Sequence, residues 1–131
     1  MSKPAAILCI DDEPKGLEVR KMLLESQGYE VHTATSGREG LAIFAHHRVP
    51  AVVLDYGMPE MNGAEVAAAL KRLDPAVKIL LFSAYMNLPK DELRWVDAYA
   101  IKGDHPKTFF AAVKQLLSCE QASSGSSCLR L

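Results

Sequence analysis

The stretch Ala51–Gly63, AVVLDYGMPEMNG, contains the clearest transition from strand to loop in the chain. Ala51–Leu54 is an unbroken apolar run, a pattern typical of a strand buried on both faces of a parallel sheet. Asp55 ends the run, and loop formers such as Gly57 follow before a helical pattern begins. We therefore expect Asp55 at the carboxyl end of a central strand, the edge where open α/β sheets bind ligands. The alternative is an aspartate that only caps a turn or a helix.

The same succession of strand, loop and helix recurs along the whole chain. Apolar or alternating runs predict strands at residues 5–10, 29–35, 51–54, 78–83 and 97–102. Apolar residues at helical spacing predict helices at residues 14–27, 37–47, 64–74, 89–96 and 106–117. Strands that alternate with helices predict one α/β domain, a (βα)5 doubly wound parallel sheet with helices on both faces.

The first two predicted helices carry different local signals. In the helix at 14–27, apolar residues such as Leu17 and Val19 fall on two arcs, so we interpret this helix as widely buried. Ser36 and Glu39 have the S-x-x-E spacing of a capping box, which predicts the start of the second helix.

Two adjacent histidines, His46 and His47, close the second predicted helix. Adjacent side chains on a helix point in different directions, so this pair is poorly placed to chelate a metal. We therefore favour an interaction of these side chains with the negative end of the helix dipole.

Composition limits the classes of partner and the compartment. The 131 residues include 15 basic and 16 acidic side chains, a net charge of −1, which predicts neither nucleic acid nor a membrane surface as partner. Three cysteines do not make a disulfide framework, and Cys9 lies in an apolar run, where a small buried core residue is expected. We expect neither a signal peptide nor a membrane helix, and a reducing, cytoplasmic location.

Polar residues stand at the ends of four predicted strands: Asp11 and Asp12, Asp55, Ser83, and Lys102. Parallel strands place their carboxyl ends on one rim, so we expect these side chains to share a pocket. Three carboxylates with no histidine or cysteine nearby suit a hard cation such as Mg²⁺. With a lysine and a hydroxyl added, the set is equipped for phosphoryl transfer, with a carboxylate as nucleophile.

This ordered set resembles the receiver domain of two-component response regulators. The matching marks are the pair Asp11–Asp12, the segment DYGMPEMNG from Asp55, Ser83–Ala84, and Tyr99 three residues before Lys102. The resemblance covers about residues 5–117 and implies a flavodoxin-like sheet of strand order 2-1-3-4-5. It also implies a signalling domain rather than an enzyme. Such a domain receives a phosphoryl group from a sensor histidine kinase or a phosphotransfer protein, and then switches its binding face toward a protein target.

The resemblance implies a role for each carboxylate of the rim. Asp55 is the implied phosphorylation site. Asp12, Asp55 and the backbone carbonyl of Gly57 are the implied direct ligands of Mg²⁺, and Asp11 is implied to act through water.

The resemblance also implies a switch. Lys102 is expected to contact the phosphoryl group, and Ser83 is the hydroxyl drawn toward it. Tyr99 is similar to the aromatic residue that turns inward when that hydroxyl moves.

The chain departs from the family pattern in three ways. Gly103 stands where the family usually has a proline after a cis peptide bond; a cis bond without proline costs about 2.5–4 kcal/mol, so we expect a trans bond here. The short span from Ser83 to Lys102 predicts a shortened fourth helix. Residues 1–117 are expected to form the receiver domain, with a disordered Ser-rich tail at 118–131 and no output domain.

Three other functions fit parts of the pattern. A receiver-like module that binds proteins without phosphorylation would share the fold, but would not need the acidic pair and Lys102. An aspartyl phosphatase would want a second carboxylate two residues after its nucleophile, where Gly57 stands. A flavin-binding protein would want a phosphate-cradling loop after the first strand, where Asp11 and Asp12 would repel a phosphate.

Overall fold

The computed structural model describes residues 4–84 and 88–118, and every structural statement below concerns these residues. Its centre is a five-stranded parallel sheet with the strand order β2-β1-β3-β4-β5. The strands are β1 (Ala6–Ile10), β2 (Glu30–Ala34), β3 (Ala51–Asp55), β4 (Lys78–Ser83) and β5 (Ala98–Ile101). The predicted fold class and the strand order 2-1-3-4-5 are both confirmed.

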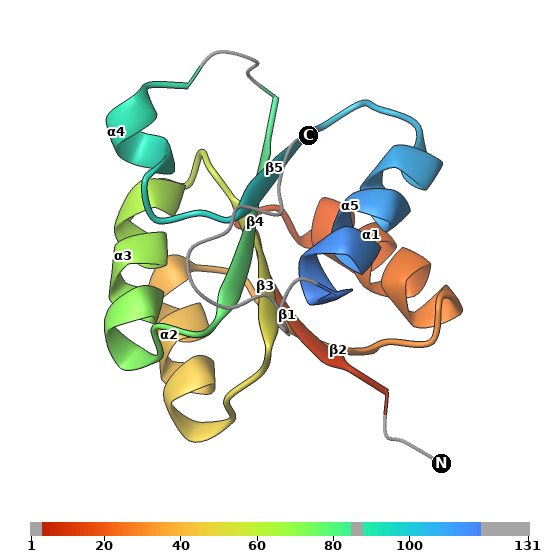
Figure 1. Ribbon diagram of the computed structural model, residues 1–131, viewed down its shortest axis with the longest axis horizontal. Coiled ribbons are helices and arrows are strands. Elements are labelled where there is room, and N and C mark those ends of the chain that lie inside the picture. The colour runs from red at the N-terminus through yellow and green to blue at the C-terminus, as the bar shows by residue number, and fades with distance from the viewer. Residues whose placement is uncertain (1–3, 85–87, 119–131) are drawn as a thin grey trace.

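Helices cover both faces of the sheet. They are α1 (Pro14–Ser26), α2 (Gly37–His46), α3 (Gly63–Leu73), α4 (Lys90–Leu93) and α5 (Pro106–Ser118). In Figure 1, α1 and α5 lie on one side, and α2, α3 and α4 lie on the other. Residues of β3 are therefore buried alternately in two cores, which explains the unbroken apolar run at Ala51–Leu54. In the described parts of the chain, no helix combines the length and the apolar character needed to span a membrane.

Side-chain caps begin α2 and α3. Asn62 Oδ1 accepts a hydrogen bond from Glu65 N at 3.0 Å, and Glu65 Oε1 accepts one from Asn62 N at 2.9 Å, a complete capping box for α3. At α2, Ser36 Oγ accepts from Glu39 N at 3.0 Å, but the Glu39 carboxylate accepts from Thr35 N at 2.7 Å. The capping box predicted for α2 is therefore only half correct, because the Glu39 carboxylate accepts from the N–H of Thr35 and not from the N–H of Ser36.

Helix α1 is buried along one narrow stripe. The stripe consists of Leu17, Arg20 and Leu24, whereas Val19 and Met22 are 56% and 62% exposed. The interpretation of this helix as widely buried is wrong, because a helix on one face of a sheet buries mainly positions spaced three and four apart. The middle position of the stripe is an arginine, and its partner lies in the functional site.

The part of the chain around β5 departs from the family pattern as expected. Helix α4 has four residues, Lys90–Leu93, which confirms the prediction of a shortened fourth helix. It is also shorter than the helix predicted at residues 89–96. No described peptide bond is cis, so Lys102–Gly103 is trans as predicted, and Gly103 has a φ of 98°, which glycine adopts without steric cost. The sequence predicts the tail at residues 118–131, but Ser118 is the last residue of α5; residues 119–131 lie outside the described residues.

Cys9 is fully buried in β1, as the sequence predicts. Burial raises the pKa of its thiol from 9.0 to about 12, because the thiolate would form away from water. Because a reagent reaches this buried thiol only when the chain opens, we expect modification of Cys9 at neutral pH to be at least about a thousandfold slower in the folded protein than in the unfolded chain. Labelling a Cys119→Ser/Cys128→Ser variant with and without denaturant measures this ratio, and equal rates would contradict the prediction.

Candidate phosphoacceptor site

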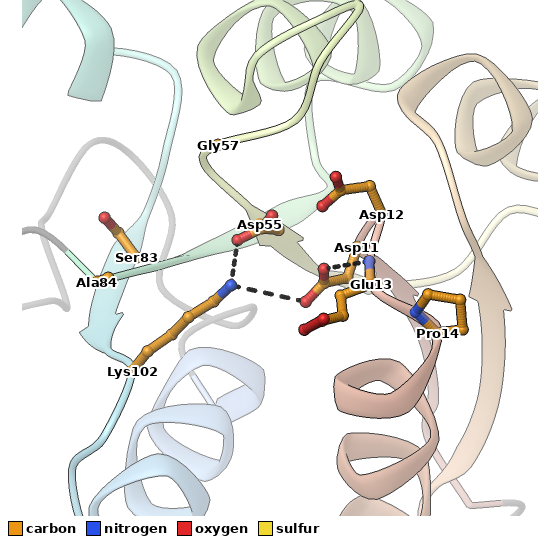
Figure 2. Close-up of a pocket in the computed structure, with 9 residues that line it drawn as sticks. All are labelled: Asp11, Asp12, Glu13, Pro14, Asp55, Gly57, Ser83, Ala84 and Lys102. Atoms are coloured by element: carbon orange, nitrogen blue, oxygen red, sulfur yellow. Dashed lines mark hydrogen bonds and ion pairs between the residues drawn. The ribbon is translucent and has the colours of Figure 1, made fainter.

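The polar residues at the carboxyl ends of the strands line one pocket of about 360 Å³. Figure 2 shows the residues that line it: Asp11, Asp12, Glu13, Pro14, Asp55, Gly57, Ser83, Ala84 and Lys102. The pocket gathers all the predicted site residues except Tyr99.

Asp55 is the last residue of β3, and its side chain is only 6% exposed. Lys102 Nζ lies 2.6 Å from Asp55 Oδ1 and 3.7 Å from Asp11 Oδ2, as the dashed lines in Figure 2 mark. The backbone places this lysine directly after β5, where its N–H donates to the Ser83 carbonyl at 2.7 Å. Since β4 lies between β3 and β5, Lys102 reaches across one strand to pair with Asp55.

The chain turns tightly after Asp55. A Cβ atom on Gly63 would lie 2.9 Å from Tyr56 Cα and 3.0 Å from the Asp55 carbonyl oxygen, so this close approach requires glycine. The Tyr56 hydroxyl donates a hydrogen bond to the Glu92 carboxylate. This contact ties the loop that follows Asp55 to helix α4, and no sequence signal pointed to it.

A second cation, Arg20 of α1, faces the carboxylates, and reasoning from sequence missed it. Its Nη1 and Nη2 atoms donate to Asp11 Oδ2 at 3.0 and 2.8 Å, and both side chains are buried. The guanidinium carbon also lies 4.7 Å from the centroid of the Phe82 ring. The one available signal was an arginine at the buried spacing between Leu17 and Leu24.

The carboxylates form a donor set that fits Mg²⁺. Asp11, Asp12 and Asp55 each offer an oxygen, and these oxygens lie within 4.8 Å of one another. Asp11 and Asp55 are buried, Asp12 is exposed, and Gly57 lines the same pocket. An all-oxygen set open to solvent on one side suits a hard cation that keeps several of its waters.

Negative charge is in excess at this site. Burial raises the pKa of the Asp55 carboxyl, the hydrogen bond from Lys102 lowers it, and the nearby Asp11 charge raises it further, with a net upward shift. Among the described residues, two cations, Lys102 and Arg20, pair with this group of three aspartates, so the cluster carries a net negative charge that a bound cation would offset.

We expect Asp55→Asn to raise the free energy of unfolding at neutral pH when metal is absent. A raised pKa in the folded state means that the ionised carboxylate is less stable there than in the unfolded chain. This cost is fully present above the folded-state pKa and disappears below the unfolded value of about 4. Urea unfolding of both proteins with a chelator should therefore give Asp55→Asn the higher free energy of unfolding at neutral pH, with a difference that shrinks as the pH falls. A difference that grew toward acid pH would contradict the prediction.

The two predicted switch residues lie in different surroundings. Ser83 is the last residue of β4, is buried, and lines the pocket with Asp55. Tyr99 is half-buried in β5, pairs in register with Leu81, and packs against the core on the side of α3 and α4. The structure thus brings Ser83 into the pocket but leaves Tyr99 outside it.

The sequence is similar to those of proteins from one known family. The chain matches the family model of the response regulator receiver domain over residues 7–100. The transcriptional regulatory protein GlrR of Escherichia coli is 36% identical over 87 residues, which are 66% of this chain and 20% of GlrR. SrrA of Staphylococcus aureus, also a transcriptional regulatory protein, is 28% identical over 120 residues, 90% of this chain and 50% of SrrA. The chain thus spans half or less of the length of these relatives.

Solved structures share the fold over most of the chain. The response regulator TrrA of Thermotoga maritima, in complex with Mg²⁺-BeF, is 34% identical with a TM-score of 0.81, and the match covers 86% of this chain and 98% of TrrA. The chemotaxis protein CheY4 of Vibrio cholerae is 27% identical, with the same TM-score and the same coverage of both chains. A CheY-like receiver domain of Methanospirillum hungatei is 28% identical with a TM-score of 0.83, over 90% of this chain and 97% of that one. With its sheet order, its acidic pocket and the match over residues 7–100, the chain belongs to the family of response regulator receiver domains.

Proposed function

We propose that Asp55 accepts a phosphoryl group from a histidine kinase or a phosphotransfer protein. The observation that supports this most is the buried Asp55 carboxylate, which lies 2.6 Å from Lys102 and faces the Asp11–Asp12 pair. In the transfer, an Asp55 oxygen attacks phosphorus while the P–N bond to the donor imidazole breaks. The imidazole keeps the bonding electron pair and takes up a proton from solvent.

The metal-binding assignment uses four groups. Asp12, Asp55 and the Gly57 carbonyl are assigned to hold Mg²⁺ directly, and Asp11 to act through water. The all-oxygen donor set and the Mg²⁺-BeF complex of the related TrrA support this assignment. When bound, Mg²⁺ neutralises part of the negative charge on the phosphoryl oxygens. The exposed position of Asp12 leaves the pocket open on the side from which a donor protein would approach.

Lys102 and Ser83 are assigned to the phosphorylated state. Lys102 already holds its ammonium group against Asp55 and would contact the added phosphoryl oxygens. Ser83 would donate its hydroxyl to the same oxygens, and Tyr99 would follow that movement. The surface expected to change consists of α4, β5 and α5, and we propose that a downstream protein binds it.

We expect Ser83→Ala to weaken the switch without abolishing it. Moving a two-state equilibrium from 1:99 to 99:1 needs about 5.5 kcal/mol, whereas one charge-assisted hydrogen bond supplies about 1.5–3 kcal/mol. Trp95 follows α4 and is the one tryptophan of the chain, so its fluorescence reports on this region. Titration with beryllofluoride and Mg²⁺ should give a partial change in the wild type and a smaller one in Ser83→Ala.

Ser26→Ala is the matched control for Ser83→Ala, because it removes a serine hydroxyl far from the pocket. Ser26 lies at the exposed end of α1, so Ser26→Ala should behave as the wild type. Identical, saturating fluorescence changes in the wild type and Ser83→Ala would remove Ser83 from the mechanism.

The target is proposed to be a protein rather than nucleic acid or a membrane. GlrR and SrrA are named transcriptional regulatory proteins, but this chain matches only part of each. Its own net charge of −1 is not that of a nucleic-acid-binding surface. A cytoplasmic location stays a prediction from the sequence.

Incubation with acetyl phosphate tests the proposed function directly. With Mg²⁺ present, the intact protein should gain the mass of one phosphoryl group, and the adduct should be lost on mild base treatment. With a chelator, the gain should disappear. A protein that stays unmodified by acetyl phosphate and by a cognate kinase would instead be a protein-binding module that is not phosphorylated.

A further inference from the structure

A second group of metal-ligating side chains lies away from the phosphoacceptor pocket. It consists of Glu30 and His32 on β2 and of His47 directly after α2. Glu30 begins β2, and His47 precedes β3, so the group lies toward the amino ends of the strands. The phosphoacceptor pocket lies at their carboxyl ends, which makes this group a separate feature of the molecule.

The fold brings these three residues together from two elements. Residues two apart on a strand point to the same face, so Glu30 and His32 both face the side that α2 covers, as Ala34 of the same strand does. His32 Nε2 lies 2.9 Å from Glu30 Oε2, and the His32 and His47 rings meet edge to face with centroids 4.5 Å apart. His46 takes no part, since its Nδ1 contacts the Ala42 carbonyl oxygen of its own helix at 3.1 Å.

We propose that Glu30, His32 and His47 form a binding site for a divalent transition-metal ion of the Zn²⁺ class. Two imidazoles and a carboxylate are ligands that zinc accepts in three-ligand sites, where water fills the fourth position. One ligand atom of each residue lies within 4.8 Å of the others, and ligands of a tetrahedral zinc ion lie about 3.3 Å apart. Glu30 and His47 are exposed, so their side chains can close this gap by rotation.

A bound ion would join the edge strand β2 to the end of α2. Among the described residues, β2 pairs with one strand, β1, so no described strand holds its outer edge. An ion that binds only the folded state stabilises the protein by mass action, so the melting temperature should rise with the concentration of zinc.

Isothermal titration of the folded protein with ZnCl₂ tests this site. The titration is done in a Cys119→Ser/Cys128→Ser background, because thiolates compete for zinc, and in excess Mg²⁺, which competes with zinc for the acidic pocket. We expect one zinc ion per chain. We expect His32→Ala and His47→Ala each to weaken binding by about tenfold or more.

The neighbouring His46 offers a matched control. His46→Ala removes an exposed imidazole from the same end of α2 and should leave zinc binding unchanged, as should Asp12→Ala in the other pocket. Glu30→Gln, at an exposed strand position, should weaken binding without loss of fold, which a melting curve without zinc confirms. The proposal is overturned if no zinc binds, or if binding survives the His32 and His47 variants or falls equally with His46→Ala.

Discussion

Asp55→Asn is expected to take up no phosphoryl group under conditions in which the wild-type protein is fully labelled. Asparagine keeps the shape of the side chain but offers no carboxylate oxygen to attack phosphorus. Asp55 lies 2.6 Å from Lys102, whereas Asp11, the other buried carboxylate of the pocket, lies 3.7 Å from Lys102 and is held by two hydrogen bonds from Arg20. Intact-mass measurement after treatment with acetyl phosphate and Mg²⁺ should show labelling below detection.

Two further variants separate the nucleophile from its surroundings. Asp12→Ala removes an assigned metal ligand, so both Mg²⁺ affinity and labelling should fall while Asp55 is intact. Asp91→Asn changes an exposed carboxylate of α4 outside the pocket and should be labelled like the wild type. A stable adduct of the same mass in Asp55→Asn would disprove the assignment of the phosphorylation site.

Arg20→Met is expected to lower the free energy of unfolding by about 3 kcal/mol, near the low end for breaking a buried ion pair. The loss arises because Asp11 stays buried while its two hydrogen bonds from Arg20 disappear. Lys102, 3.7 Å from Asp11, and the Glu13 N–H, 2.9 Å from it, still compensate part of the charge. Urea unfolding without metal measures the change.

A double-mutant cycle shows whether the pair itself causes this loss. Asp11→Asn/Arg20→Met leaves neither charge unpaired, so it should lose less stability than the sum of the two single variants. In Arg20→Met alone, Asp11 has one cation fewer, so Mg²⁺ should bind more tightly than in the wild type. Additive stability losses together with unchanged Mg²⁺ affinity would show that Arg20 acts only through packing.

Local chain signals sufficed for the alternating α/β fold class and for the rim of the site, whereas the strand order 2-1-3-4-5 was predicted from the resemblance to receiver domains. The apolar run that ends at Asp55, the acidic pair and Lys102 are each set by residues adjacent in sequence to a strand. Parallel strands must place those ends on one edge, so no knowledge of packing was needed to group them. The trans bond at Gly103 followed from the cost of a cis bond without proline, and the short fourth helix followed from a span between Ser83 and Lys102 that is shorter than the family pattern.

Contacts between distant elements required the folded chain. Arg20 occupies a buried position of α1 at which helical periodicity predicts an apolar residue. Only the packing of α1 against the sheet shows that this arginine forms an ion pair with Asp11. The same holds for His47, whose partner is His32 on another element rather than the adjacent His46. Periodicity tells which face of an element is buried, but it carries no information on which side chain of another element meets that face. Such pairings depend on the distances between elements, and these exist only once the sheet and its helices have packed.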